Sequence, residues 1–332
     1  MKRVAINGLG RIGRLALRQY ITTPPDNIEV VACNDLTPVD DLAYLIRYDS
    51  VHGRAPFPVE HSLDYLQFGS KQIKVFNEKD PAKLPWKELG VDVVLECTGR
   101  FRGRKDAGKH LEAGASKVII SAPSDDTDTT IVMGVNENSY DSQKHNVISN
   151  ASCTTNSLAP VAKVLNDAFG IEYLMVTTIH AYTSSQTLID LPARKRRRGR
   201  AAAVSLIPSS TGAAKATALV IPELKGKMDA IAVRVPVPDG AITDIVAHLE
   251  KDVSVETVNA ALKKAADGEL KGILGYSEEE LVSADIISDP HSGTIDATST
   301  RVLANRVAKV LVWYDNEFGY SRRMLDLASV VV

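Results

Sequence analysis

Cysteine is scarce in this chain of 332 residues, and the three that are present are Cys33, Cys97 and Cys153. Three cysteines are too few for a disulfide framework, and their spacing matches no metal-ligand pattern. We therefore expect no metal site, and we predict that the protein works in a reducing compartment, the cytoplasm.

Long apolar runs and an excess of charge of one sign are also missing. No apolar run approaches the ~20 residues that cross a bilayer. Arg11, Arg14 and Arg18 interrupt the region after the basic start, so we expect neither a membrane span nor a cleavable signal peptide. The 39 basic and 41 acidic side chains leave a net charge of −2, which argues against nucleic acid or a membrane as the main partner.

What is present is the composition of an ordinary globular protein, with 44% apolar and 24% charged residues. The length predicts about two domains. In the first third, short apolar strands alternate with helical patterns, which is typical of a parallel sheet covered by helices on both faces. We expect the strands at 4–6, 28–33, 91–95 and 118–120, and the helices at 12–21 and 103–113.

The second half has a different pattern. Residues 152–169 show the helical spacing of apolar side chains. Two later segments, 228–235 and 242–249, alternate apolar and polar residues, and they predict an antiparallel sheet with one face in water. A last helix is expected at 316–332.

A glycine-rich turn follows the first strand. Gly8, Gly10 and Gly13 form the pattern G-x-G-x-x-G at the start of a predicted helix. Glycines permit the tight turn and the approach of a pyrophosphate, and the helix N-terminus offers N–H groups to the phosphates. The next strand is followed by Asp35, 22 residues beyond Gly13, where a carboxylate binds the ribose hydroxyl and repels the 2′-phosphate of NADP. The pattern predicts NAD, although glycines also serve turns and packing, and an aspartate also caps helices.

Cys153 is the cysteine whose surroundings indicate chemistry. It lies between small polar residues at the start of a predicted helix, where the helix dipole stabilises a thiolate and lowers the thiol pKa. Cys33 and Cys97 instead lie on or beside apolar strands. His180 ends the apolar strand that follows the Cys153 helix, so it is a candidate base for the thiol, although a lone histidine is more often structural.

Together these residues resemble the phosphorylating glyceraldehyde-3-phosphate dehydrogenases over essentially the whole chain. The most specific motif is the heptapeptide NASCTTN around Cys153. The resemblance also rests on INGLGRIGR at 6–14, YDS at 48–50, TIHAYT at 178–183, STGAAK at 210–215, RVP at 234–236 and WYDNE at 313–317.

The resemblance implies a reaction and a set of contacts. Cys153 attacks the aldehyde of glyceraldehyde 3-phosphate, His180 takes the proton, hydride passes to NAD, and inorganic phosphate releases 1,3-bisphosphoglycerate. The implied contacts are Thr183 and Arg234 for the substrate phosphate; Ser152, Thr154, Thr211 and Gly212 for the attacking phosphate; and Gly8, Gly10, Arg11, Ile12, Gly13, Asp35, Lys79, Ser121 and Asn316 for NAD.

The implied fold is α/β, with two domains. Residues 1–151, completed by a helix at 316–332, form a Rossmann-type NAD-binding domain with a doubly wound parallel sheet. Residues 152–315 form an α+β catalytic domain with a mainly antiparallel sheet. The resemblance further implies a homotetramer, with the loop at 181–203 in a subunit interface.

Two features depart from the family pattern. Lys79 stands where the family often has arginine, so we expect a less rigid contact with the adenine region. The basic run, Arg194 to Arg200, holds six cations where relatives have fewer arginines, with an acidic and an apolar residue among them. It is open to three interpretations: an interface loop, a site for a polyanion or regulatory partner, or a feature that relaxes discrimination against NADP. Leu191 and Pro192, in contrast, match the members that use NAD.

Two other functions remain as alternatives. An erythrose-4-phosphate dehydrogenase shares the cysteine heptapeptide, although HAYT at 180–183 and VPVPDG at 235–240 look more like the glyceraldehyde-3-phosphate enzyme. A nucleic-acid-binding or partner-binding protein that uses the basic run would bind in a salt-sensitive way and would produce no NADH.

Overall fold

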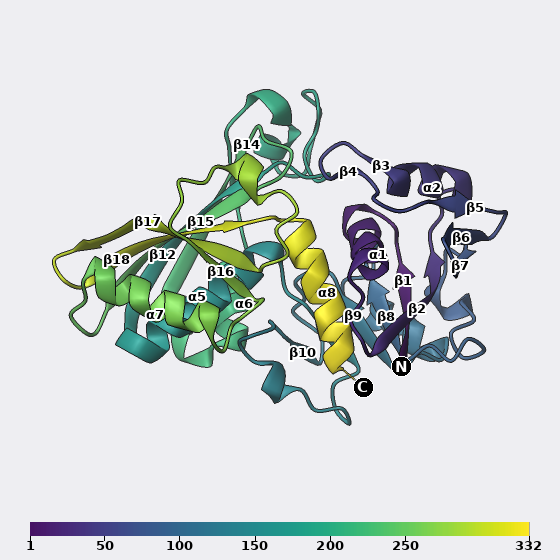
Figure 1. The fold of residues 1–332 in the computed structure, drawn as a ribbon, viewed down its shortest axis with the longest axis horizontal. Helices are drawn as coiled ribbons and strands as arrows, with labels where there is room; N and C mark the ends of the chain where they lie inside the picture. The colour runs from purple at the N-terminus through teal and green to yellow at the C-terminus, as the bar shows by residue number, and fades with distance from the viewer. Residues whose placement is uncertain (332) are drawn as a thin grey trace. The chain divides into compact units, whose positions relative to one another are not determined.

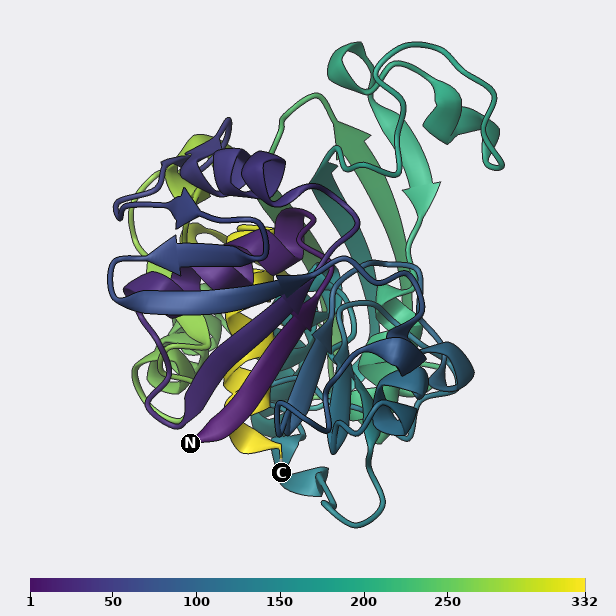
Figure 2. The ribbon, with the colours of Figure 1, turned by 90° about the vertical axis from the view of Figure 1, so that its right-hand side faces the viewer.

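The computed structural model describes residues 1–331, and the chain divides into two compact units. The first unit is Met1–Ser152, joined by the chain from Ser321 onward, and the second is Cys153–Tyr320. Each unit has a large sheet of its own (Figures 1 and 2).

The first unit contains a nine-stranded sheet with the order β10-β11-β9-β8-β1-β2-β7-β6-β5. Strands from β10 to β7 run parallel to their neighbours, and β6 and β5 add an antiparallel edge. The strand order changes direction between β1 and β8, and open α/β sheets bind ligands beyond the carboxyl ends of the strands at such a switch point. The strands are β1 Lys2–Asn7, β2 Ile28–Asn34, β5 Glu60–His61, β6 Tyr65–Phe68, β7 Lys71–Phe76, β8 Val93–Glu96, β9 Lys117–Ile120, β10 Thr129–Thr130 and β11 Val147–Ser149.

Within residues 1–152 the helices are short apart from the one after the glycine-rich turn. The predicted helix at 103–113 is wrong in one respect, because it is broken at Gly108. There the Leu111 N–H bonds the Gly108 carbonyl three residues back, which tightens the turn. The helices are α1 Arg11–Thr22, α2 Val39–Arg47, α3 Arg104–Ala107 and α4 Lys109–Glu112, and a small hairpin joins β3 Tyr48–Asp49 to β4 Gly53–Arg54.

The last helix, α8 Phe318–Val330, starts two residues later than predicted. Asp315 explains the start, because its Oδ1 accepts hydrogen bonds from the N–H groups of Glu317 at 2.8 Å and Phe318 at 2.6 Å. The end of α8 is tied to the first unit, where the Ser329 carbonyl accepts from Lys2 Nζ at 2.8 Å and from Asn27 Nδ2 at 2.7 Å.

The second unit contains a seven-stranded sheet with the order β13-β14-β12-β15-β18-β17-β16. The predicted mainly antiparallel sheet is confirmed, and the two segments expected in it, 228–235 and 242–249, both belong to it without being neighbours. Strand β12 lies between them, parallel to β14 and antiparallel to β15. The strands are β12 Ile171–Ala181, β13 Ile207–Ser210, β14 Met228–Val235, β15 Ala241–Leu249, β16 Leu274–Ser277, β17 Gly293–Leu303 and β18 Val307–Tyr314.

Helices cover one face of this sheet (Figure 1). They are α5 Cys153–Phe169, α6 Ala213–Val220 and α7 Val255–Asp267. On the strands, alternate residues are buried beneath the helices, such as Leu174 and Val176 on β12, while Tyr173 and Met175 are exposed. Within residues 1–331, no helix combines the length and the apolar character that a membrane crossing requires.

Candidate functional site

The turn between β1 and α1 depends on glycine at two positions. Gly8 has a φ of +93°, and a Cβ there would lie 2.7 Å from the Thr98 nitrogen. A Cβ on Gly13 would lie 2.0 Å from the Gly8 carbonyl oxygen, whereas a Cβ on Gly10 would meet nothing within 4 Å. Gly8 and Gly13 therefore serve the fold, and Gly10 leaves open space at the start of the helix.

A pair of alanine variants separates these two roles. We expect Gly13→Ala to lower the free energy of unfolding by about 3 kcal/mol, because the added methyl collides with backbone. Gly10→Ala should change it by less than about 0.5 kcal/mol. If the pyrophosphate of NAD approaches this turn, Gly10→Ala should still weaken NAD binding by about tenfold, through the loss of one close backbone contact to a charged group.

Urea unfolding and titration with NAD measure the two effects separately. A Gly10→Ala protein with unchanged NAD affinity would contradict the role of this turn in binding the pyrophosphate.

A buried network of polar side chains adjoins the turn at Asn7, the residue before Gly8. The sequence did not reveal this network. Asn7 Nδ2 donates to Glu96 Oε2 at 2.5 Å, and Asn34 Nδ2 donates to Asn7 Oδ1 at 2.7 Å. Trp86 Nε1 donates to His110 Nδ1 at 2.9 Å, which leaves His110 Nε2 as the proton donor to Glu96 Oε2 at 3.1 Å. These five residues come from five separate segments, so no local pattern could have identified them.

Predicted cofactor residues line a cavity of about 370 Å³ at the carboxyl ends of β1 and β2. The Asp35 carboxylate is held there by two backbone N–H groups, from Leu9 at 2.6 Å and from Thr37 at 2.9 Å. The capping role that the sequence left open is not found, because the N-cap of the next helix, α2, is Pro38 and no side chain caps it. The bonds from Leu9 and Thr37 instead orient the carboxylate. The predicted residues that line the cavity are Gly8, Gly10, Asp35 and Lys79.

Arg11 and Ile12 open helix α1. The Arg11 guanidinium makes a bidentate pair with Asp49, at 2.5 Å and 3.1 Å. Burial opposes ionisation of Asp49, but the bonds from Arg11 and from the N–H groups of residues 51 and 52 outweigh it and lower the Asp49 pKa to about 2. The Arg11 guanidinium is paired with Asp49. If Arg11 contacts the cofactor, we therefore expect the contact to come from its backbone N–H. Ser121 follows β9, and its N–H bonds the Glu96 carbonyl at 3.0 Å.

Cys153 and His180 meet in the second unit. Cys153 is the first residue of α5, and His180 is the tenth residue of β12. Cys153 Sγ lies 3.4 Å from His180 Nε2. Cys153 as a residue is partly exposed, whereas His180 is buried. The sequence-based hypothesis of a thiol facing a base is thus matched by the geometry.

The expected ionisation of the thiol is corrected by the structure. Burial raises the pKa of the Cys153 thiol, and it outweighs the Arg234 charge and the Thr154 hydroxyl and N–H, which favour the thiolate. The prediction of a lowered pKa is therefore wrong, because the helix start does not offset removal of the thiolate from water. Burial and then Arg234 also lower the pKa of His180 to about 3. At pH 7 the pair is a neutral thiol facing a neutral imidazole.

Tyr314 completes the surroundings of this pair, and the sequence analysis quoted it only as part of a motif. Its hydroxyl lies 3.0 Å from Thr154 Oγ1 and 2.7 Å from Thr178 Oγ1. Its ring stands edge-on to the His180 imidazole at a centroid distance of 5.9 Å. Tyr314 thereby ties the start of α5 to β12. It also occupies the Thr154 hydroxyl that we predicted for the attacking phosphate.

Strand register brings Arg234 to His180. The two residues are direct partners on the parallel strands β14 and β12. Arg234 Nη1 lies 2.6 Å from His180 Nδ1 and donates to the Ala181 carbonyl at 2.8 Å. The sequence could not reveal this pairing, because 54 residues separate the two positions.

The remaining predicted phosphate contacts lie on loops and helix starts. Thr183 Oγ1 lies 2.8 Å from Ser185 Oγ, which accepts from Arg198 Nη1 at 3.2 Å. Thr211 Oγ1 accepts from the Ala213 N–H at 3.2 Å, and Gly212 is the N-cap of α6. Ser152 directly precedes α5.

The basic run has a mixed environment. Arg198 Nε donates to Ser209 at 2.9 Å, Lys195 Nζ donates to Ser210 at 2.5 Å, and Arg200 pairs with Asp190 at 2.8 Å. Residues 194–197 are all exposed. These contacts do not distinguish between the three interpretations of the basic run, which remain predictions.

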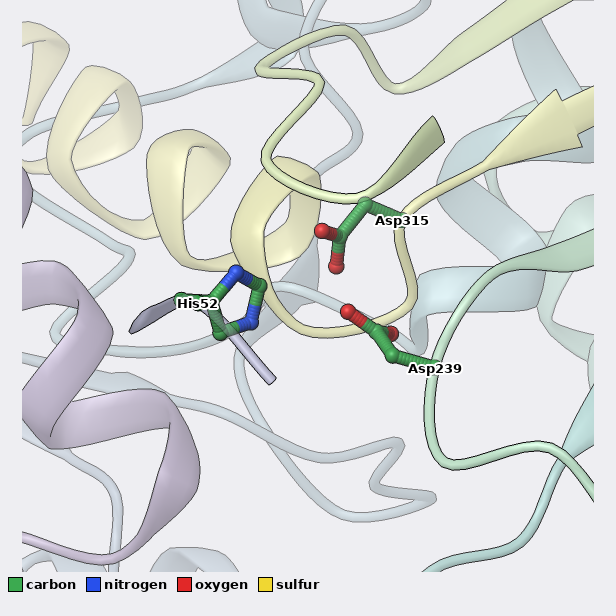
Figure 3. Close-up of side chains that lie close together, drawn as sticks. All are labelled: His52, Asp239 and Asp315. Carbon is green, nitrogen blue, oxygen red and sulfur yellow. The ribbon is translucent and has the colours of Figure 1, made fainter. Parts of the chain in front are cut away.

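Asp239 and Asp315 form a buried carboxyl pair that the sequence analysis missed. Figure 3 shows the two side chains close together, while His52, also labelled there, belongs to the first unit. Asp315 Oδ2 accepts from the Ser288 N–H at 2.7 Å. Burial, and then the charge of Asp315, raise the pKa of Asp239. Asp239 is the protonated member of the pair at neutral pH.

This pair predicts a pH-dependent effect on stability. An aspartate in the unfolded chain ionises near a pKa of about 3.9, so the raised pKa of Asp239 makes the parent less stable as the pH rises above that value. Asp239→Asn removes this loss. We expect the urea midpoint of the variant, relative to the parent, to increase between about pH 5 and about pH 8. The exposed Asp229→Asn is the matched control, and a pH-independent difference for Asp239→Asn would contradict the raised pKa.

Asn316, the predicted nicotinamide contact, lies in the turn after β18. It is buried, and its Oδ1 has no hydrogen-bond partner within residues 1–331. A buried amide oxygen of this kind is rare unless a ligand or water satisfies it, and a carboxamide N–H is a suitable donor.

Comparison with known proteins decides the family. Residues 2–104 match the model for the glyceraldehyde 3-phosphate dehydrogenase NAD binding domain, and residues 152–316 match the model for the C-terminal domain. A glyceraldehyde-3-phosphate dehydrogenase of Geobacillus stearothermophilus is 58% identical over 99% of this chain and 98% of its own length. The chain belongs to the glyceraldehyde-3-phosphate dehydrogenase family.

Other relatives agree with this membership. The glyceraldehyde-3-phosphate dehydrogenase 1 of Bacillus subtilis is 57% identical, and the glyceraldehyde-3-phosphate dehydrogenase of Streptomyces coelicolor is 54% identical, each over 99% of this chain and 98% of the relative. The predicted family, fold class, NAD cofactor and NAD-dependent dehydrogenase activity are confirmed. The erythrose-4-phosphate and nucleic-acid alternatives are not favoured.

Proposed function

We propose that this member of the family forms 1,3-bisphosphoglycerate through a thioester on Cys153. The observation that carries the proposal is the 3.4 Å contact between Cys153 Sγ and His180 Nε2. A thiol and an imidazole at this distance form a nucleophile and base pair, and Cys153 is the partly exposed member. The other two cysteines are buried, so neither reaches a substrate.

The steps follow from the proton positions. Cys153 loses its proton to His180 Nε2 as the sulfur attacks the aldehyde carbon, and His180 passes that proton to the former carbonyl oxygen, which gives a neutral thiohemiacetal and leaves Nε2 free again. When bound, NAD supplies a hydride acceptor. His180 takes the hydroxyl proton as the thiohemiacetal loses its hydride and becomes a thioester. Attack by inorganic phosphate then breaks the C–S bond, releases the acyl phosphate and returns the thiol.

Arg234, with Thr183, is proposed to bind the phosphate of the substrate. Arg234 is partly buried and adjoins His180, and a guanidinium is suited to phosphate by charge and by shape. Ser152, Thr154, Thr211 and Gly212 are proposed for the attacking phosphate. Because the Thr154 hydroxyl already contacts Tyr314, we assign its backbone N–H to this task.

NAD fits the residues of the first unit. Gly10 leaves room for a pyrophosphate, and Asp35 presents an oriented carboxylate to the ribose. We therefore assign Gly8, Gly10, Asp35 and Lys79, with the start of α1 and Ser121, to cofactor binding, and Asn316 to the carboxamide. Residues 1–151 with 316–332 are proposed as the NAD-binding domain and 152–315 as the catalytic domain.

Omitting one reactant at a time tests the mechanism. With glyceraldehyde 3-phosphate and NAD but no inorganic phosphate, we expect a burst of one NADH per subunit that then stops, because the thioester keeps Cys153 occupied. Adding phosphate should restore turnover. NADP should support much slower turnover, because Asp35 repels its 2′-phosphate.

The same assay discriminates between alternative outcomes. Continued turnover without phosphate would mean that water takes the acyl group, and absence of the burst would remove the covalent intermediate. Faster turnover with erythrose 4-phosphate than with glyceraldehyde 3-phosphate would favour the sister enzyme.

We also propose a homotetramer. Support comes from the uncovered face of the sheet in the second unit, where Tyr173, Met175, Ile179 and Ile231 are exposed. An apolar sheet face is a common site of contact between subunits. Sedimentation equilibrium measures the mass, and a stable monomer would contradict the proposal.

We also propose a cytoplasmic location. Cys33, Cys97 and Cys153 are free thiols, and a reactive thiol is preserved in a reducing compartment. Cell fractionation tests it.

A further inference from the structure

A buried carboxyl group adjoins the glycine-rich turn of the first unit. Glu96 is the last residue of β8 and is 1% exposed. Its Oε2 lies 2.5 Å from Asn7 Nδ2 and 3.1 Å from His110 Nε2. Its Oε1 lies 2.8 Å from the Thr98 N–H nitrogen and also contacts the Thr98 hydroxyl. Burial of a carboxylate costs free energy unless hydrogen bonds replace its water, so the direction of these four contacts decides its state.

The direction is fixed on one side by the backbone of Glu78. The Glu78 N–H donates to Asn34 Oδ1 at 2.8 Å, and Asn34 Nδ2 donates to the Glu78 carbonyl at 2.9 Å. These two bonds determine which end of the Asn34 amide is the nitrogen. The same nitrogen donates to Asn7 Oδ1 at 2.7 Å. Asn7 Nδ2 is therefore the atom that faces Glu96, and it donates.

On the other side the direction is fixed by Trp86. An indole N–H only donates, so His110 Nδ1, at 2.9 Å, accepts and the ring carries its proton on Nε2. His110 Nε2 and Asn7 Nδ2, 3.3 Å apart, are then two donors to the same Glu96 oxygen. With the N–H and hydroxyl of Thr98, four donors fill the roughly four lone-pair sites of a carboxylate. Glu96 is thus an anion that neutral groups hold.

The residues that Glu96 holds line the proposed cofactor cavity. Asn7 and Thr98 are both part of its wall. Asn7 directly precedes Gly8, and the Thr98 nitrogen lies so close to Gly8 that a Cβ there would be 2.7 Å away. The carboxylate therefore connects the glycine-rich turn after β1 to the segment after β8, on the opposite side of the turn.

We propose that Glu96 is a positioning residue for NAD, whose hydrogen bonds set the spacing between the glycine-rich turn and Thr98. The proposal rests on the assignment of this cavity to NAD. Because its side chain is buried, Glu96 acts through Asn7 and Thr98. Cys153 and His180 belong to the second unit. We therefore expect loss of this positioning to raise the KM for NAD and to leave kcat at saturating NAD within about twofold of the parent.

Exchange of the amide and the carboxylate between positions 7 and 96 tests this role. Glu96→Gln keeps the shape of the side chain, but its NH₂ faces donors whichever way the amide turns: Asn7 and His110 on one side, or Thr98 on the other. Asn7→Asp places a second carboxylate within 2.5 Å of the first. Each single change should raise the Kd for NAD by about tenfold, because the segments on either side move apart.

The double variant Asn7→Asp with Glu96→Gln should recover the parent Kd to within about threefold. The carboxylate at position 7 then accepts from Asn34, from the amide at position 96 and from His110 Nε2, which lies 3.3 Å from the nitrogen that is replaced. The amide oxygen at position 96 accepts from Thr98. Every donor regains an acceptor, with the negative charge moved by one residue.

A network that served only stability would give a different result. The single variants would unfold at lower urea concentration, while the folded protein would bind NAD with the parent Kd. Titration with NAD measures this Kd directly. The increase of the urea midpoint with NAD concentration gives it for a destabilised protein as well. Glu112→Gln, an exposed change on α4, is the matched control and should keep the parent Kd.

Two results would overturn the proposal: the parent Kd in Glu96→Gln, or a double variant that binds NAD no better than the single variants. If a single variant does not fold, the double variant decides, and a folded double variant with a Kd raised more than about threefold overturns the proposal.

Asp35→Ala separates this proposal from the assignment of the cavity. If Asp35→Ala weakens NAD binding and Glu96→Gln does not, only the positioning role of Glu96 is wrong. If Asp35→Ala also keeps the parent Kd, the assignment of this cavity to NAD is itself wrong.

Discussion

Replacing Cys153 with serine is expected to lower kcat for NADH formation by about 10⁴-fold or more, as loss of a covalent nucleophile does elsewhere. Serine keeps the size and the hydrogen bond to His180 Nε2, but its hydroxyl is far less acidic than a thiol. His180, whose pKa is lowered to about 3, is too weak a base to ionise it. The loss should appear in kcat, with little change in NAD affinity, because the predicted cofactor cavity lies in the first unit.

The burst assay is the sharpest measurement for this variant. Cys153→Ser should give no burst of NADH in the absence of phosphate. Cys33→Ala is the matched control, because Cys33 is a buried thiol on β2, and it should keep a full burst. A Cys153→Ser protein with more than about a tenth of the parent activity would remove the covalent mechanism.

Replacing His180 with asparagine is expected to cause the second large loss of catalytic rate. General base catalysis contributes about 10²-fold to 10⁴-fold, and we expect a loss in this range. The pH dependence should also change. In the parent the imidazole is neutral from about pH 5 upward, because its pKa is lowered to about 3, so the rate should vary little near neutrality.

In His180→Asn only the solvent takes the thiol proton. Burial raises the pKa of Cys153, so the variant rate should rise about tenfold for each pH unit below that pKa. Stopped-flow measurement of the NADH burst between about pH 6 and about pH 9 gives the profile. His248, which pairs with Glu172 at the surface, supplies the control His248→Asn. A flat profile in His180→Asn would mean that another group is the base.

Local features were predictable where their cause lies within a few residues. The turn from Gly8 to Gly13 is one case, because a positive φ and a close backbone contact exclude a Cβ whatever the rest of the chain does. The strand at 228–235 is another, since alternation of side chains is a property of the strand itself. Cys153 at the start of a helix also follows from its own neighbours.

Pairing partners and burial were not predictable in this way. The insertion of β12 between β14 and β15 aligns His180 with Arg234, and neither residue's neighbours in sequence contain that information. The pairing of Asp239 with Asp315 was not predictable either, because Asp239 lies between β14 and β15 whereas Asp315 follows β18. The predicted thiolate failed for a related reason, because the helix start is visible in sequence but the removal of water from Cys153 is not.

The sequence by itself determined the family, the NAD cofactor and the dinucleotide turn, because these depend on residue type and short spacing, and on the same basis it predicted the nucleophile and its base. Only the tertiary structure decided the register that sets Arg234 on His180, the buried carboxyl pair and the proton states of the site. Those properties arise from desolvation and from contacts between distant segments, and both exist only once the chain has packed.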